Sequence, residues 1–207
     1  MLHFNGFFQR EEDDPIWKVF VFDPHTQNIL SPLLKVSQLR NEGVTVFRTL
    51  SSIDDSCAIS DVPVLFFVQP TDENIKQICS LLRRDIFSCA FVNWSGFVSR
   101  RGLELLAEQS ARERPVCFEK IFQVYDMFCD FVCLDETLFV LSKEISFLPS
   151  GTVGQEAEVD ELAQKLLCVF ATTGQIPIVR CRAGASRTEM IARRLVELVK
   201  DQLLMGK

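Results

Sequence analysis

The chain has 207 residues, of which 47% are hydrophobic, and a formal net charge of −6. The length and apolar content predict one large domain, or one domain with part of a second, around a sizeable core. The negative charge argues against an extended nucleic-acid surface, which needs clustered lysine and arginine. No apolar run reaches the roughly 18 residues of a membrane-spanning helix. The acidic start MLHFNGFFQREEDDP does not resemble a signal or transit peptide, so we expect a chain of the cytosol or nucleus.

The first part of the chain alternates short apolar runs with helical patterns. Four runs predict strands, at residues 17–23, 44–50, 62–69 and 86–92. Ser31-Pro32 predicts the start of a helix that ends at Gly43, and a second helix should follow Pro70-Thr71. Two more helices are predicted at 101–110 and 115–128, joined by the charged turn ARER. This alternation indicates an α/β fold with a parallel flavodoxin- or Rossmann-like sheet and flanking helices.

After the sheet the chain changes character. Residues 130–140 are predicted to be extended, as a fifth strand that leads into a further segment. A linker at 149–158 then precedes a helix, a short strand and a long helix, predicted at 159–171, 176–181 and 186–204. This small additional α/β segment cannot bury a sheet by itself. We therefore divide the chain into residues 1–134, the sheet domain, and residues 135–207, a separate segment.

Neither the loops nor the cysteines carry the pattern of a cofactor or metal site. A phosphate-binding loop needs glycines, but DPHTQNILSP after the first strand has none, and neither G-x-G-x-x-G nor G-x-x-x-x-G-K-[ST] occurs. The eight cysteines are scattered, and no His or third Cys stands near Cys129 and Cys133 to complete a zinc site. We expect buried, reduced thiols, no metal and no cofactor.

One stretch imitates a catalytic site. In Val179–Thr188, Cys181 and Arg187 are separated by five residues, between a predicted strand and a helix start, which is the layout of the phosphate loop in cysteine-dependent phosphatases. Against this activity, Arg180 stands where those enzymes typically carry a histidine, and no general-acid loop precedes it. A phosphatase that uses the Cys181–Arg187 loop is the alternative function; an inert turn is favoured.

Five strings together resemble the SM (Sec/Munc) family of SNARE regulators, most closely its Sly-type ER–Golgi branch: WKVFVFD, ILSPLLKVSQLRNEGVTVF, DVPVLFFVQPTDENI, QVYDMFCDFVCLDETLFVL and GQIPIVRCRAG. The resemblance runs from about residue 17 to about residue 195. It implies a non-catalytic protein of vesicle trafficking and membrane fusion, in the cytoplasm, that meets ER and Golgi membranes only through SNAREs. Residues 1–134 would be domain 1, and residues 135–207 the first segment of domain 2 of a family whose chains are several times longer.

The resemblance also implies a partner and a site. Domain 1 of the Sly-type branch receives the N-terminal peptide of a syntaxin-five-class SNARE, with a phenylalanine in an apolar pocket. The matching positions are Leu103, Leu106 and Ala107 on the helix at 101–110, and Ile121 and Val124 on the helix predicted at 115–128. Helical spacing places each set on one face, so we expect a groove between the two helices. The stripe could equally be ordinary core, and a structural α/β domain with a partner unrelated to SNAREs is the third interpretation.

Overall fold

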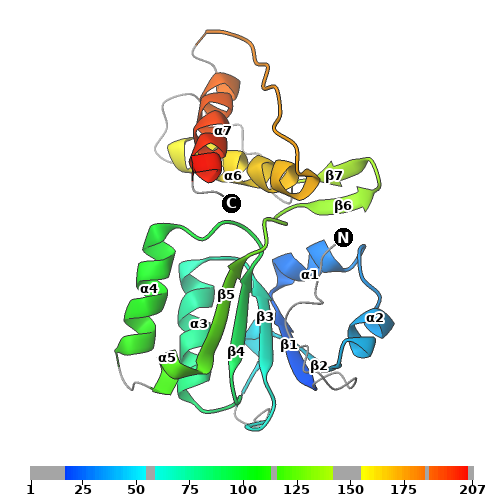
Figure 1. The fold of residues 1–207 in the computed structure, drawn as a ribbon, viewed down its shortest axis with the longest axis vertical. Helices are drawn as coiled ribbons and strands as arrows, with labels where there is room; N and C mark the ends of the chain where they lie inside the picture. The colour runs from blue at the N-terminus through cyan, green and yellow to red at the C-terminus, as the bar shows by residue number, and fades with distance from the viewer. Residues whose placement is uncertain (1–16, 55–58, 113–115, 142–154, 185–186, 205–207) are drawn as a thin grey trace. The chain divides into compact units, whose positions relative to one another are not determined.

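A computed structural model describes residues 17–54, 59–112, 116–141, 155–184 and 187–204. The chain divides into two compact units between Met127 and Phe128. In the first unit, five parallel strands form one sheet in the order β2-β1-β3-β4-β5 (Figure 1). The strands are β1 (Lys18–Phe22), β2 (Val44–Thr49), β3 (Val64–Val68), β4 (Ala90–Trp94) and β5 (Ile121–Asp126). This is the flavodoxin-like order of a doubly wound fold, which confirms the predicted fold class.

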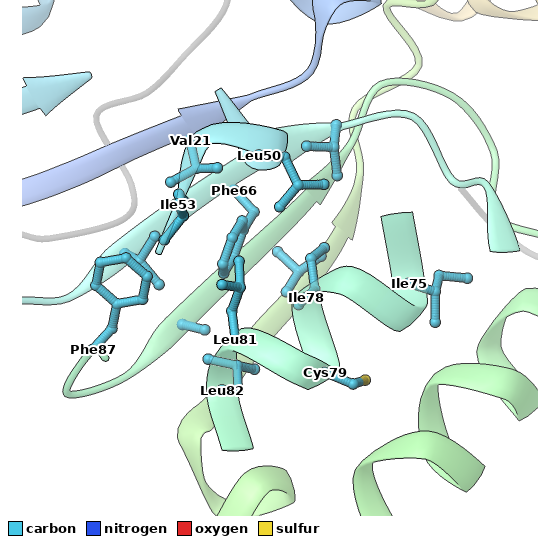
Figure 2. Packing of buried hydrophobic residues seen from close by; sticks show 14 of the residues in the cluster. Val21, Leu50, Ile53, Phe66, Ile75, Ile78, Cys79, Leu81, Leu82 and Phe87 are labelled. Carbon is cyan, nitrogen blue, oxygen red and sulfur yellow. The ribbon is translucent and has the colours of Figure 1, made fainter. Parts of the chain in front are cut away.

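The helices of the first unit cover both faces of this sheet. They are α1 (Pro24–Leu30), α2 (Val36–Asn41), α3 (Asp72–Arg83), α4 (Arg100–Ala111) and the short α5 (Val116–Lys120). On one face, α3 and α4 pack over alternate residues of the strands, and Figure 2 shows Ile78 and Leu81 of α3 beside Phe66 of β3. On the other face, α1 and α2 meet the phenylalanines of β1 and β2 around an apolar cavity of about 200 Å³.

The helix predicted from Ser31 to Gly43 is wrong, because two shorter helices form instead. Asp23 caps α1: its Oδ1 accepts a hydrogen bond of 2.7 Å from the amide of Thr26, and Pro24 occupies the first turn. Ser31 is therefore the C-terminal cap of α1. The Asp23-Pro24 pair lies eight residues before the Ser31-Pro32 pair and starts the helix there instead, and the chain turns before α2 begins at Val36.

The helix predicted at 115–128 is also wrong. Only α5 is helical, and the chain then enters β5, the edge strand that pairs with β4. The sequence IFQVYD is rich in β-branched and aromatic residues, and pairing with a buried neighbour decides its conformation over a helical spacing of apolar residues. As a result, the fifth strand of the sheet lies at 121–126 and not at 130–140, where it was predicted.

The second unit begins with a hairpin. Strands β6 (Val132–Asp135) and β7 (Leu138–Val140) pair antiparallel around a turn in which Asp135 accepts a hydrogen bond of 2.8 Å from the amide of Glu136. Helices α6 (Gln155–Thr173) and α7 (Arg187–Leu204) confirm the two predicted helices. They pack together through Ala163, Leu167, Leu195 and Leu198. Among the described residues, no helix is long and apolar enough to cross a membrane.

The strand predicted at 176–181 is wrong. This stretch has no regular secondary structure, and Ile176 and Ile178 are exposed. No strand in the described part of the second unit pairs with it, so its apolar run has no ladder to join.

Candidate peptide-binding site

The usual ligand position of this fold is the crevice at the carboxyl ends of β1 and β3. Here the buried carboxylate of Asp23 closes it. Its Oδ1 accepts from the amide and the hydroxyl of Thr26, and its Oδ2 accepts from the amide of Gln69 and from Nδ2 of Asn74, both at 2.8 Å. The four donors satisfy the carboxylate and tie the two loops together. The crevice is thus used internally, which fits a chain without a phosphate-binding motif.

The helix that carries the first three predicted site residues, α4, is held tightly against α3. Ser99 caps it by accepting a hydrogen bond of 3.1 Å from the amide of Gly102. A Cβ at Gly102 would lie 2.9 Å from Cγ2 of Val98 and 3.6 Å from Cδ1 of Ile75. The glycine therefore permits a close approach that fixes the position of α4 beside the sheet.

On α4, the three predicted residues differ in exposure. Leu106 is 6% exposed and belongs to the core cluster under the helix. Leu103 is 45% exposed and Ala107 is also exposed. A ligand would contact Leu103 and Ala107 at the surface, and Leu106 lies buried beneath them. Leu106 is consequently core, and the binding role predicted for these residues stays a prediction.

On β5, a bulge places the other two predicted residues on one face. Ala90 pairs with Ile121, but its neighbour Phe91 pairs with Gln123, so Phe122 is the extra residue. Val124 then pairs with Val92, and both Ala90 and Val92 point into the core cluster beneath α3 and α4. Ile121 packs against the same cluster as Leu106. Ile121 and Val124 are three residues apart, which is a helical spacing, but here the bulge in the strand places them on one face.

Two aromatic residues of β5 lie on the opposite face of the sheet. Tyr125 pairs with Asn93 and is 43% exposed, and Phe122 is 69% exposed with its ring centroid 5.2 Å from that of Phe91. Both residues fell within the helix predicted at 115–128, so this aromatic surface was missed. The signal that could have revealed it is the β-branched and aromatic composition of IFQVYD.

The phosphatase-like loop of the second unit is occupied by its own side chains. The guanidinium of Arg187 forms an ion pair with Glu158, whose side chain is buried. The amide of Gly184 donates a hydrogen bond of 3.0 Å to the carboxylate of Glu189. The arginine and the backbone donor that would bind a phosphate therefore hold carboxylates, while Cys181 is exposed at the surface.

Five other cysteines whose side chains the structure describes are buried or partly buried. Cys79, Cys129 and Cys168 are buried, Cys89 and Cys133 are partly buried, and all are free of disulfides. Burial raises the pKa of the Cys129 thiol, and the neighbouring Cys168 and Asp130 raise it further. Such a thiol is a poor nucleophile. No group of metal-ligating side chains is found in the described part of the chain.

The chain is similar to known proteins over nearly its whole length. The Sec1 family model matches residues 18–207. Sec1 family domain-containing protein 1 of Rattus norvegicus is 33% identical over 98% of the chain, and protein sly1 of Schizosaccharomyces pombe is 35% identical over 96%. The chain covers 33% and 31% of these proteins, so it spans about a third of the length of its curated relatives.

Solved structures agree with this relationship. The crystal structure of Sly1p in complex with an N-terminal peptide of Sed5p is 32% identical, with a TM-score of 0.80, over 91% of this chain and 32% of that one. The SM protein Vps45 in complex with the Qa SNARE Tlg2 shares the fold at 17% identity, with a TM-score of 0.77 over 94% of this chain and 34% of that one. The resemblance to the SM family and its Sly-type branch is confirmed, and the chain belongs to the Sec1 family.

Proposed function

We propose that this chain is a SNARE-binding module of vesicle trafficking, and that its first unit binds the N-terminal peptide of a syntaxin-five-class SNARE. The observation that carries the proposal is the pair of exposed apolar side chains, Leu103 on α4 and Val124 on β5, on elements whose inner residues Leu106 and Ile121 share one core cluster. The relative Sly1p has been crystallised with an N-terminal peptide of Sed5p, and that similarity covers 91% of this chain.

The chemistry of such a site is apolar. Burying one phenylalanine side chain contributes roughly 1.5–3 kcal/mol, enough to dominate the affinity of a short peptide. Ala107, with its small side chain, leaves room for the ring beside Leu103. The charge contribution that Arg112 could add is reduced, because Arg112 is paired with Glu108 on the surface of α4. Arg114, a second arginine close to α4 in the sequence, lies outside the described residues.

The wider role follows from this interaction. We infer that the chain acts in ER–Golgi transport and membrane fusion, as a cytoplasmic protein that reaches membranes only indirectly through SNAREs, without nucleic acid or cofactor. Residues 1–134 would be domain 1 and residues 135–207 the first segment of domain 2. We also infer that it is not an enzyme, which is supported by the ion pair of Arg187 with Glu158 in the phosphatase-like loop.

Calorimetry with a synthetic Sed5p N-terminal peptide tests the proposal. Leu103→Lys should weaken binding at least tenfold, since a charged side chain on the rim forfeits about 1.4 kcal/mol or more of apolar contact. The matched control is Glu104→Gln, which makes the same change in charge one residue away on the exposed side of α4. Equal affinities for both variants and the wild type would place the site elsewhere. A thermal melt of each variant confirms that the fold is intact.

A further inference from the structure

The cavity beneath α1 and α2 is not used by the proposed function. It has a volume of about 200 Å³ and lies between these two helices and the strands β1 and β2 (Figure 1). Three phenylalanines line it from the sheet: the ring centroid of Phe20 is 6.0 Å from that of Phe22 and 6.2 Å from that of Phe47. Leu30 and Leu39 line it from the helices. An apolar cavity of about 150 Å³ is large enough for benzene, so this one has room for a larger apolar group.

The residues around the cavity favour an apolar ligand that enters from solvent. Seven of the nine lining residues are apolar, and the two polar ones are Gln27 and Ser31. The hydroxyl of Ser31 already donates a hydrogen bond of 2.7 Å to the carbonyl of Gln27. The lining residue Val36 is 53% exposed, so its side chain lies at the opening of the cavity.

This opening is positively charged. Lys35 precedes Val36 in the chain, and Arg40 lies one helical turn after it on the same side of α2. Both cations are exposed, and within the described ranges neither forms an ion pair. The acidic residue at the end of α2, Glu42, lies near another cation: burial lowers the pKa of the Lys18 ammonium, and the carboxylate of Glu42 opposes that shift. The cations at the opening are therefore available to an anionic group of a ligand.

We propose that this cavity binds a medium-chain fatty acid. The hydrocarbon chain lies over the rings of Phe20 and Phe47, where it is removed from water. The carboxylate is held at the opening by Lys35 and Arg40 through charge-assisted hydrogen bonds. A chain suits the site better than a ring alone, because Arg40 lies about 5.4 Å along α2 from Val36, so the ligand must carry its charge at a distance from its apolar end. This site is independent of the peptide site proposed on α4 and β5.

Calorimetry with sodium decanoate tests the apolar part of the site. Val36→Asp should weaken binding at least tenfold, since it places a hydrated negative charge at the opening. Leu33→Asp is the matched control, because Leu33 is also exposed, at 42%, makes the same change in charge three residues away, and does not line the cavity. This control should change the affinity by no more than about twofold. Equal losses in the two variants, or no binding of decanoate to the wild type, would overturn the proposal.

A neutral probe tests the charged part. Decanol should bind the wild type more weakly than decanoate, and Arg40→Gln should weaken decanoate about threefold while leaving decanol unchanged. Nuclear Overhauser effects should connect the terminal methyl group of decanoate with the ring protons of Phe20 and Phe47. Their absence, or displacement of decanoate by the Sed5p peptide, would overturn the proposal, and displacement would make the cavity part of a peptide site. Failure of decanoate to bind would leave the proposed function intact, because that function is tested by the Sed5p peptide alone.

Discussion

In the sequence, two segments resemble binding sites: the segment that forms β5 and the Cys181 loop. In the structure, the apolar side chains of the first are exposed, whereas the polar groups of the second are already paired. On β5, the apolar side chains of Phe122 and Val124 are exposed. In the Cys181 loop, Arg187 and the amide of Gly184 already hold the carboxylates of Glu158 and Glu189. Residues of a suitable type can bind a ligand only where other groups of the protein do not already occupy them.

The difference also separates the two units chemically. The surface that α4 and β5 expose in the first unit is apolar, which suits the side chains of a peptide. The loop of the second unit has charge, but that charge is neutralised internally and costs energy to release. We therefore expect changes at α4 and β5 to alter binding, and changes at the Cys181 loop to alter neither binding nor turnover.

The largest effect should come from Leu106, which divides core from surface on α4. Leu106→Lys places a charge in the core cluster and should destabilise the first unit by about 3 kcal/mol or more. Leu103→Lys, on the exposed side, should change stability by no more than about 0.5 kcal/mol. Urea unfolding of both variants measures this. A stable Leu106→Lys protein would mean that Leu106 belongs to an open pocket.

The next effect tests whether the peptide binds at β5 and not at the opposite edge of the sheet. Val124→Lys on β5 should weaken the Sed5p peptide about thirtyfold, which corresponds to about 2 kcal/mol of lost apolar burial. Thr45→Lys is its control on β2, the strand at the opposite edge of the sheet, where Thr45 is likewise exposed. Comparable losses from both lysines would indicate a general charge effect and not a site at β5.

A smaller effect should appear with pH in the second unit. Because burial raises the pKa of the Cys129 thiol, the folded state keeps its proton while the unfolded state loses it above about pH 8.5. The stability that Cys129 contributes is complete below that pH and falls as the pH rises, by at most about 1.4 kcal/mol per pH unit. Denaturation of the wild type and Cys129→Ala at pH 7 and pH 10 measures it; parallel pH profiles would refute the shift.

The last prediction is that a change in the Cys181 loop has no effect on activity. Cys181→Ser should not change the hydrolysis of a small aryl phosphate, because the arginine and the amide of the loop hold carboxylates. The wild type should be as inactive as the variant. Turnover that disappears with the serine would establish the phosphatase alternative. Glu189→Gln makes the assay more stringent, because it replaces the carboxylate that accepts from the amide of Gly184 with a neutral amide. This variant should also be inactive.

Local signals predicted much of the first unit. β1 and β3 were predicted because continuous apolar runs must be buried on both faces, and α3 because Thr71 caps a helix with a clear apolar stripe. Local signals did not predict that a short helix and a strand replace the single helix expected at 115–128. Ile121 and Val124 lie on one face in a helix and also in a strand with a bulge, so their spacing supports both conformations.

The sequence by itself determined the fold class, the family and the absence of a phosphate-binding motif, because these depend on residues close together in the chain. Tertiary structure alone decided that β5 is an edge strand, that Leu106 is buried while Leu103 is exposed, and that Arg187 is paired with Glu158. Each of these depends on a neighbour far away in the sequence: β4 for the strand, the sheet for the leucines and α6 for the arginine. Local patterns carry no information on such neighbours, since only folding brings them into contact.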